Sequence, residues 1–143
     1  MYVLRGRGTD SESDRRVTRR LSERVTARGV PALRAWTPHR QVAFGRRDVA
    51  TDGYDRAKQL AAERGYAVVE REVGGRAVAY TGETVAFTSV VPNDGEDDIT
   101  TRYENATALL KRALQSLGAT VRDGEPDAAF CPGDHSIRGD GKI

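Results

Sequence analysis

The sequence predicts an α+β fold in which helices flank a mixed, largely antiparallel β-sheet. Three segments carry apolar residues at helical spacing, and shorter segments rich in alanine, valine and aromatic residues lie between them. The resulting order of helix, strands, helix, strands, helix and strand is typical of a mixed sheet covered by helices. With 38% hydrophobic and 31% charged residues the chain is an ordinary globular one, and its 143 residues are expected to form a single domain, 1–143.

The first helix is predicted over Thr9 to Arg28. Thr9 and Glu12 have the spacing of a capping box, and Gly29 is a typical helix stop. Apolar side chains recur every four residues in a narrow stripe formed by Val17, Leu21 and Val25. The exposed side carries Arg15, Arg16, Arg19 and Arg20. Acidic residues interrupt these arginines and no aromatic residues lie between them to stack bases, so a solvated face is favoured over nucleic-acid binding.

Two strand-like segments follow, Ala32 to Trp36 and Gln41 to Gly45, with the turn-forming sequence Thr-Pro-His between them. They are predicted to form a hairpin or to lie as adjacent strands. A second helix is predicted over Asp52 to Arg64, followed by a short strand at Ala67 to Val69.

Residues 71–87 indicate two more strands, Ala77 to Tyr80 and Thr84 to Phe87, joined through Thr81 to Glu83. The third helix is predicted over Thr101 to Leu117, because apolar residues mark one face of it. A last short strand is expected near Ala119 to Val121.

Composition narrows the range of functions. No apolar run reaches the roughly 20 residues that span a bilayer, and the N-terminus lacks the apolar segment of a secretory signal, so a cytoplasmic protein without a membrane partner is expected. The single cysteine, Cys131, excludes an internal disulfide and suits a reducing compartment. Cys131, Asp134 and His135 lie close in sequence, but a closed zinc site needs four ligands, so no metal site of protein side chains is expected.

The pair Gly74-Gly75, followed by Arg76, is unusual beside a strand. Glycine weakens a strand unless the backbone needs a positive φ angle, a bulge or close approach of a ligand. Two bare amides beside a guanidinium suit a phosphate, and the small residues Ala77 and Ala79 leave room for an elongated ligand. A simple turn with Arg76 in solvent explains the same spacing, and spacing alone favours that simpler interpretation.

Three segments, in the same order, resemble the lipoate–protein ligase A family of the biotin/lipoate ligase superfamily. The sequence from Arg71 to Val78 is similar to the motif R-R-x-S/T-G-G-G/R-A-V-x-H-D. PALRAWTPHRQVAFGRRD, from Pro31 to Asp48, resembles L-R-x-W-x-P-x-x-x-x-G-R, and 141–143 resembles the beginning of G-K-K/I-x-G-x-A-Q. The resemblance implies a catalytic domain like that of class II aminoacyl-tRNA synthetases, incomplete at its C-terminus.

The activity that the resemblance implies is a two-step ligation. Lipoate and ATP, with Mg²⁺, would form lipoyl-adenylate, and the acyl group would pass to a lysine of a lipoyl carrier domain, from a 2-oxoacid dehydrogenase or the glycine cleavage H protein. Lys142 matches the family's active-site lysine, Arg71 an arginine that contacts the phosphates, and Gly74 and Gly75 the substrate loop. The residues implied to border the nucleotide and acyl chain are Arg76, Ala77, Val78 and Ala79.

The chain also departs from the motifs. Glu70 replaces the first arginine, Val73 the hydroxyl residue, and Tyr80-Thr81 the His-Asp pair. Because the sequence ends one residue after Lys142, a truncated enzyme, or one completed by a separate chain, is expected.

Two other functions stay open at the sequence level. The related octanoyltransferases use a cysteine and no ATP, but when Lys142 is set on their lysine their cysteine falls near Ala128 rather than at Cys131. A binding module without catalytic activity, which retains only acyl or nucleotide binding, is the other alternative. The choice among lipoate, octanoate and biotin is open as well, because it depends on the depth of a pocket.

Overall fold

The computed structural model describes residues 1–93, 95, 98–125, 127 and 135–139. The chain divides into two compact units, Met1–Pro92 and Asn93–Ile143, and each is described by itself. The first unit contains β1 (Tyr2–Arg5), α1 (Ser11–Arg28), β2 (Ala32–Trp36), β3 (Gln41–Phe44), α2 (Arg46–Val49), α3 (Tyr54–Glu63), β4 (Ala67–Glu70), β5 (Val78–Tyr80) and β6 (Ala86–Val90). The second contains α4 (Ile99–Ser116), β7 (Val121–Asp123) and β8 (Ile137–Gly139). The mixed α+β class expected from the sequence is confirmed, whereas the single domain stays a prediction.

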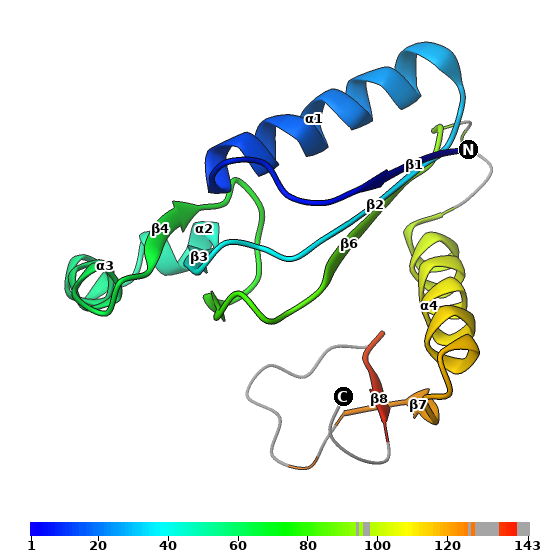
Figure 1. Ribbon diagram of the computed structural model, residues 1–143. Helices are drawn as coiled ribbons and strands as arrows, with labels where there is room; N and C mark the ends of the chain where they lie inside the picture. The colour runs from blue at the N-terminus through cyan, green and yellow to red at the C-terminus, as the bar shows by residue number, and fades with distance from the viewer. Residues whose placement is uncertain (94, 96–97, 126, 128–134, 140–143) are drawn as a thin grey trace. The chain divides into compact units, whose positions relative to one another are not determined.

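One sheet of the first unit has the order β1-β2-β6, and α1 lies over it (Figure 1). Strand β2 pairs in parallel with β1 and antiparallel with β6. The small core between helix and sheet consists of Leu21, Val25 and Ala32, with Tyr2 and Val90 packed against it. The predicted stripe on the first helix therefore does face a sheet, through Leu21 and Val25.

The second sheet has the order β4-β3-β5, and helix α3 lies beside β4 (Figure 1). Strand β3 pairs in parallel with β4 and antiparallel with β5. The ring of Tyr54, at the start of α3, meets Phe44 of β3 edge-on, with ring centroids 5.1 Å apart. This aromatic contact holds α3 on the sheet.

Two predicted strand pairings are wrong. Strands β2 and β3 are consecutive in the chain but belong to different sheets, and so do β5 and β6. Each parallel pair is instead joined by helical segments, α1 between β1 and β2, and α2 and α3 between β3 and β4. Parallel strands need such a long crossover, whereas a tight turn joins only antiparallel neighbours.

A buried ion pair connects α1 to β2. Arg34 is 1% exposed, and its guanidinium donates to the carboxylate of Asp14 and to the Asp14 carbonyl, the latter at 2.8 Å. The same guanidinium donates to the Thr18 hydroxyl at 2.9 Å and covers the ring of Trp36 at 4.3 Å. The Asp14 carboxylate also accepts a hydrogen bond from the Gly8 amide at 2.7 Å. The ion pair of Asp14 and Arg34 therefore connects α1, β2 and the segment between β1 and α1.

In the second unit, β7 pairs antiparallel with β8 next to α4. Lys111 of α4 donates to the Asp123 carboxylate at 2.7 Å, and the rings of Tyr103 and His135 stack with centroids 4.7 Å apart. Among the described residues, no helix combines the length and apolar character that crossing a membrane requires.

Candidate functional site

The glycine pair lies in an exposed loop, residues 71–77, between β4 and β5. Both Gly74 and Gly75 are exposed, and neither belongs to a strand. The predicted strand from Ala77 begins one residue later, at Val78. The loop therefore departs from the sheet immediately after Glu70, the residue of β4 that pairs with Phe44 at the end of β3.

Backbone hydrogen bonds attach this loop to the end of β3. The Arg71 amide donates to the Phe44 carbonyl at 2.8 Å, and the Arg46 amide donates to the Val73 carbonyl at 3.0 Å. Arg46 adds a second bond from its guanidinium to the carbonyl of Glu72. Residues 71–73 are thus held against the turn from β3 into α2.

Gly45 makes the close approach of the loop possible. A Cβ atom at Gly45, which is buried, would lie 2.1 Å from the carbonyl oxygen of Gly75. The Gly45 amide donates to the Asp48 carboxylate at 2.8 Å, which fixes the turn at the start of α2. Any side chain at position 45 would displace the glycine loop.

The side chain of Arg71 folds back onto the same loop. Its guanidinium donates to the Arg76 carbonyl at 2.6 Å, and its Nε atom is buried without a hydrogen-bond partner in the described part of the chain. The terminal nitrogen of the Arg71 guanidinium therefore connects the two ends of the loop, while the Nε–H group makes no hydrogen bond within the described residues. The phosphate contact implied for Arg71 stays a prediction.

The backbone N–H groups of Gly74 and Gly75 have no hydrogen-bond acceptor within the described residues. Gly75 has a φ of +90°, a conformation that other residues rarely adopt, and an added Cβ at Gly74 would meet no atom within 4 Å. Exposed, unpaired amides of this kind can bind a phosphate, carboxylate or carbonyl oxygen.

Strand β5 continues from the loop along the edge of the second sheet. It pairs Val78 with Ala43 and Ala79 with Val42, while Val78 and Ala79 remain exposed. Ala77 is half-buried and Arg76 exposed. Six of the predicted residues form one continuous segment that begins three residues after Arg71: Gly74, Gly75, Arg76, Ala77, Val78 and Ala79. Lys142, the predicted catalytic residue, and Cys131 and Ala128 lie outside the described residues.

Glu70 has a structural role at the position where the ligase motif has an arginine. Its carboxylate accepts a hydrogen bond from the Tyr54 hydroxyl, which joins β4 to α3. Burial, followed by this bond to Glu70, raises the pKa of Tyr54 to about 12. The acidic side chain therefore braces the strand from which the loop departs.

Sequence reasoning did not identify Gly45 and Arg46 as parts of the loop structure. The available signal was the Gly-Arg pair at the end of the second similar segment, whose contact with the distant glycine loop becomes visible only in three dimensions. No group of three or more histidine, cysteine, aspartate or glutamate side chains within the described ranges could hold a metal ion.

Comparison with known proteins gives related sequences that are named as octanoyl- or lipoyltransferases. The chain is 31% identical over 111 residues to an octanoyl-GcvH:protein N-octanoyltransferase of Geobacillus kaustophilus, covering 77% of this chain and 39% of that protein. It is 28% identical over 125 residues to a lipoyl-GcvH:protein N-lipoyltransferase of Listeria monocytogenes, covering 85% of this chain and 45% of that protein. The chain thus spans about two fifths of the length of the curated relatives that it matches.

Solved structures share the fold. A lipoate-protein ligase A bound with ATP superposes with a TM-score of 0.72 at 21% identity, over 93% of this chain and 53% of that one. A bi-partite lipoate protein ligase from Thermoplasma acidophilum gives a TM-score of 0.64 at 23% identity, over 87% of this chain and 48% of that one. The profile of the lipoyl protein ligase A/B catalytic domain matches residues 14–142, which is nearly the whole chain. The chain therefore belongs to the lipoyl protein ligase A/B catalytic domain family.

Proposed function

We propose that this chain takes part in protein lipoylation, as an enzyme that places an octanoyl or lipoyl group on a lysine of a carrier protein. The observation that carries the proposal is the exposed Gly74-Gly75 loop, whose amides lack hydrogen-bond partners in the described structure while its flanks are pinned to β3. Fixed donors of this kind stabilise the oxygen of an acyl carbonyl or of an acyl phosphate as negative charge develops on it.

The group transfer ends in the same way for every donor. The lysine ε-amine of the carrier attacks the activated acyl carbonyl, an amide bond forms, the bond to the leaving group breaks and the amine loses a proton. The Gly74 and Gly75 amides would bind the carbonyl oxygen or the adjoining phosphate, and β5, with exposed Val78 and Ala79, would border the acyl chain. Within this scheme the loop positions the donor, and the lysine of the carrier supplies the nucleophile.

Transfer without ATP is the first candidate for the donor step. The relatives compared above are named as octanoyl- or lipoyl-GcvH transferases, and the identity to them reaches 31%. In that case the acyl group would arrive as an amide or thioester on a carrier. Cys131, the single cysteine of the sequence, would take the acyl group as a thioester while the bond to the previous carrier breaks and that carrier leaves as a protonated amine or thiol.

ATP-dependent ligation is the second candidate, supported by the three similar segments and by Lys142. The exposed, unpaired amides of Gly74 and Gly75 fit a phosphate in chemical terms. Bound ATP would supply the adenylate leaving group, and Mg²⁺ would be carried by its phosphates, since no acidic cluster occurs in the described part of the chain. The ammonium of Lys142 would neutralise charge on the reacting phosphate, and its loss is expected to slow activation by about 10²- to 10³-fold.

One experiment separates these candidates. The purified chain is incubated with an apo carrier protein and either octanoyl-GcvH without ATP or lipoate with ATP and Mg²⁺, and the mass of the carrier is measured. Acylation without ATP that is lost in Cys131→Ser supports the transferase, whereas acylation with pyrophosphate release that is lost in Lys142→Ala supports the ligase.

A third outcome concerns binding without chemistry. If neither reaction proceeds, calorimetric titration with a non-hydrolysable lipoyl-adenylate analogue is the next measurement. Binding would support a module that another chain completes, and adding candidate partner chains would then test for restored turnover. Absence of both binding and turnover would contradict the proposed function.

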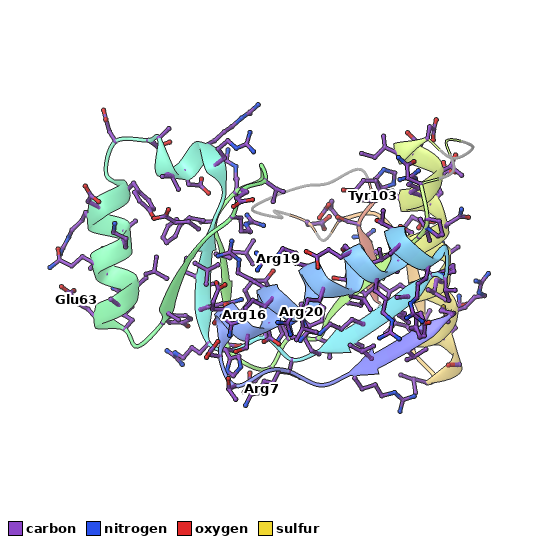
Figure 2. The ribbon with its side chains drawn as sticks, turned by 90° about the horizontal axis from the view of Figure 1, so that it is seen from above. Arg7, Arg16, Arg19, Arg20, Glu63 and Tyr103 are labelled. Carbon is purple, nitrogen blue, oxygen red and sulfur yellow. The ribbon has the colours of Figure 1, made fainter. Side chains whose placement is uncertain are left out.

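The arginines of α1 are proposed to dock an acidic carrier protein. Figure 2 shows Arg16, Arg19 and Arg20 on this helix, and the guanidinium groups of Arg19 and Arg20 make no ion pair or hydrogen bond within the described residues. Exposed charges of this kind mainly raise association rates, and salt weakens their effect. The double variant Arg19→Ala, Arg20→Ala should raise the KM for the carrier at low salt but not at high salt. An equal KM at low salt would exclude this surface.

A further inference from the structure

We propose that Arg46 is a positioning residue, which latches the Gly74-Gly75 loop and aims its amides outward. This inference rests on the proposed function for its kinetic consequence, but the latch itself is a property of the fold. Although Arg46 is exposed, its guanidinium turns back to donate to the Glu72 carbonyl, and its amide donates to the Val73 carbonyl. One residue therefore holds two consecutive carbonyl groups of the loop.

The direction of the Gly74 amide follows from these bonds. A trans peptide unit is planar, so its C=O and N–H groups point in opposite directions. Because the Val73 carbonyl points toward the Arg46 amide at 3.0 Å, the N–H of Gly74 points away from α2. That N–H makes no hydrogen bond within the described structure and is exposed, so it is presented to a ligand.

Arg46 and Arg71 hold the loop from its two ends. Arg46 bonds Glu72 and Val73 at the beginning of the loop, and the Arg71 guanidinium bonds the Arg76 carbonyl at its end. The Gly75 carbonyl between them rests against Gly45, where a Cβ would lie 2.1 Å away. A loop fixed in this manner loses little conformational freedom when the ligand binds, which is how preorganisation increases affinity.

Charge alone suggests a different role for Arg46, namely docking of an acidic carrier together with Arg47. Docking predicts that loss of either arginine has the same effect, whereas the latch predicts an effect only when Arg46 is replaced. The guanidinium of Arg47 makes no hydrogen bond or ion pair in the described part of the chain, although both arginines lie in the first turn of α2. Arg47→Met is therefore a matched control, since it removes the same charge and leaves the latch intact.

The first test needs no activity. Hydrogen exchange of the intact chain is followed at the amides of residues 46 and 71, which donate to Val73 and Phe44 respectively. Arg46→Met is expected to accelerate exchange at both positions by roughly tenfold, the effect of one lost charge-assisted bond. Arg47→Met should leave both rates unchanged. Equal exchange in Arg46→Met and the unaltered chain would overturn the latch.

The second test uses whichever acyl transfer reaction the chain performs. Arg46→Met should raise the KM for the acyl donor by roughly tenfold with a smaller change in kcat, while the KM for the acceptor carrier stays constant. Added guanidinium ion should restore part of the lost affinity in Arg46→Met alone. A rise in carrier KM that is equal in the Arg46 and Arg47 variants would instead assign both residues to docking and contradict the proposal. If neither acyl transfer nor binding of the lipoyl-adenylate analogue occurs, the proposed function fails, and the exchange measurement still decides whether the latch exists.

Discussion

Gly74 and Gly75 are adjacent in the sequence, but the structure gives them different requirements. Gly75 needs its φ of +90°, its carbonyl lies against Gly45, and Arg71 closes the loop around it. Gly74 has no positive φ, and a Cβ built there would meet no atom within 4 Å, so the fold itself does not require glycine at this position. The motif showed that this segment was unusual, but it could not show that the backbone requires glycine at position 75 and not at position 74.

This difference predicts opposite outcomes for two alanine substitutions. Gly75→Ala forces an alanine into the left-handed region, which costs about 1–2 kcal/mol, and should lower the free energy of unfolding or displace the loop. Gly74→Ala should leave the free energy of unfolding within about 0.5 kcal/mol of the unaltered chain, because the new methyl group meets no neighbouring atom. Chemical denaturation measures both values. Equal destabilisation by the two substitutions would contradict the distinction.

The pair Tyr54 and Glu70 predicts a response to alkaline pH. The pKa of Tyr54 is raised to about 12 by burial and by the bond to Glu70, so the folded state favours the neutral hydroxyl. Its stabilising contribution is complete below the unfolded pKa of about 10 and is lost as the pH rises toward 12. Stability of the unaltered chain should therefore fall more steeply across this interval than that of Tyr54→Phe, as measured by denaturation at stepped pH. Parallel curves for the two proteins would contradict the assignment.

At the scale of elements, the three longer helices were predictable because their signals are local, whereas the four-residue helix α2 was not predicted. α1 ends at the predicted arginine, followed by Gly29 with a φ of +65°, and α4 begins within two residues of the predicted threonine. The N-cap of α1 was misassigned by one residue, since Asp10 rather than Thr9 accepts the Ser13 amide, and α4 begins after Asp98, whose carboxylate accepts the Thr101 amide. Helix caps compete over short distances, and a neighbouring aspartate serves as well as a threonine.

The strand pairings were not predictable, because they depend on contacts that are distant in sequence. Strand β1 was missed because four residues at the N-terminus carry no periodicity, although β1 becomes the parallel neighbour of β2. The connections from β2 to β3 and from β5 to β6 both pass from one sheet to the other, although β2 and β3 were expected to form a hairpin or to lie as adjacent strands. The same limit applies to the site, because the contact of Gly45 with Gly75 joins positions thirty residues apart.

The buried pair of Arg34 and Asp14 joins α1 to β2 and predicts a large loss of stability on mutation. Arg34→Met retains much of the apolar bulk but leaves the Asp14 carboxylate, only 8% exposed, without its cationic partner. Removal of one member of a buried pair typically costs about 3–5 kcal/mol. Thermal and denaturant unfolding of the first unit should reveal this loss. Replacement of both residues, Asp14→Leu with Arg34→Met, should recover part of it, and no recovery would indicate that the bonds to Thr18 and Gly6 matter more than the charges.

At the scale of the whole molecule, the small core limits stability. The buried apolar residues of the described chain are few: Leu21, Val25, Ala32, Ala43, Phe44, Ala61 and Val121. Large apolar side chains such as Leu117 and Ile99 are more than 70% exposed within the described structure. A domain of this kind has a modest margin between folded and unfolded states, so binding of a ligand or partner changes its stability measurably.

Ligand binding is therefore expected to raise the melting temperature. A lipoyl-adenylate analogue at about one hundred times its Kd should add roughly 2.7 kcal/mol to the free energy of unfolding, provided that only the folded chain binds it. For a chain of this size the gain corresponds to several degrees, which scanning fluorimetry detects. Because the Gly74-Gly75 loop is proposed to hold the ligand, the rise in melting temperature at the same analogue concentration should be smaller in Arg46→Met and unchanged in Arg47→Met. Neither substitution removes a residue of the apolar core. If the analogue raises the melting temperature equally in all three proteins, binding occurs without the latched loop, and if it raises none of them, the loop does not bind an acyl nucleotide.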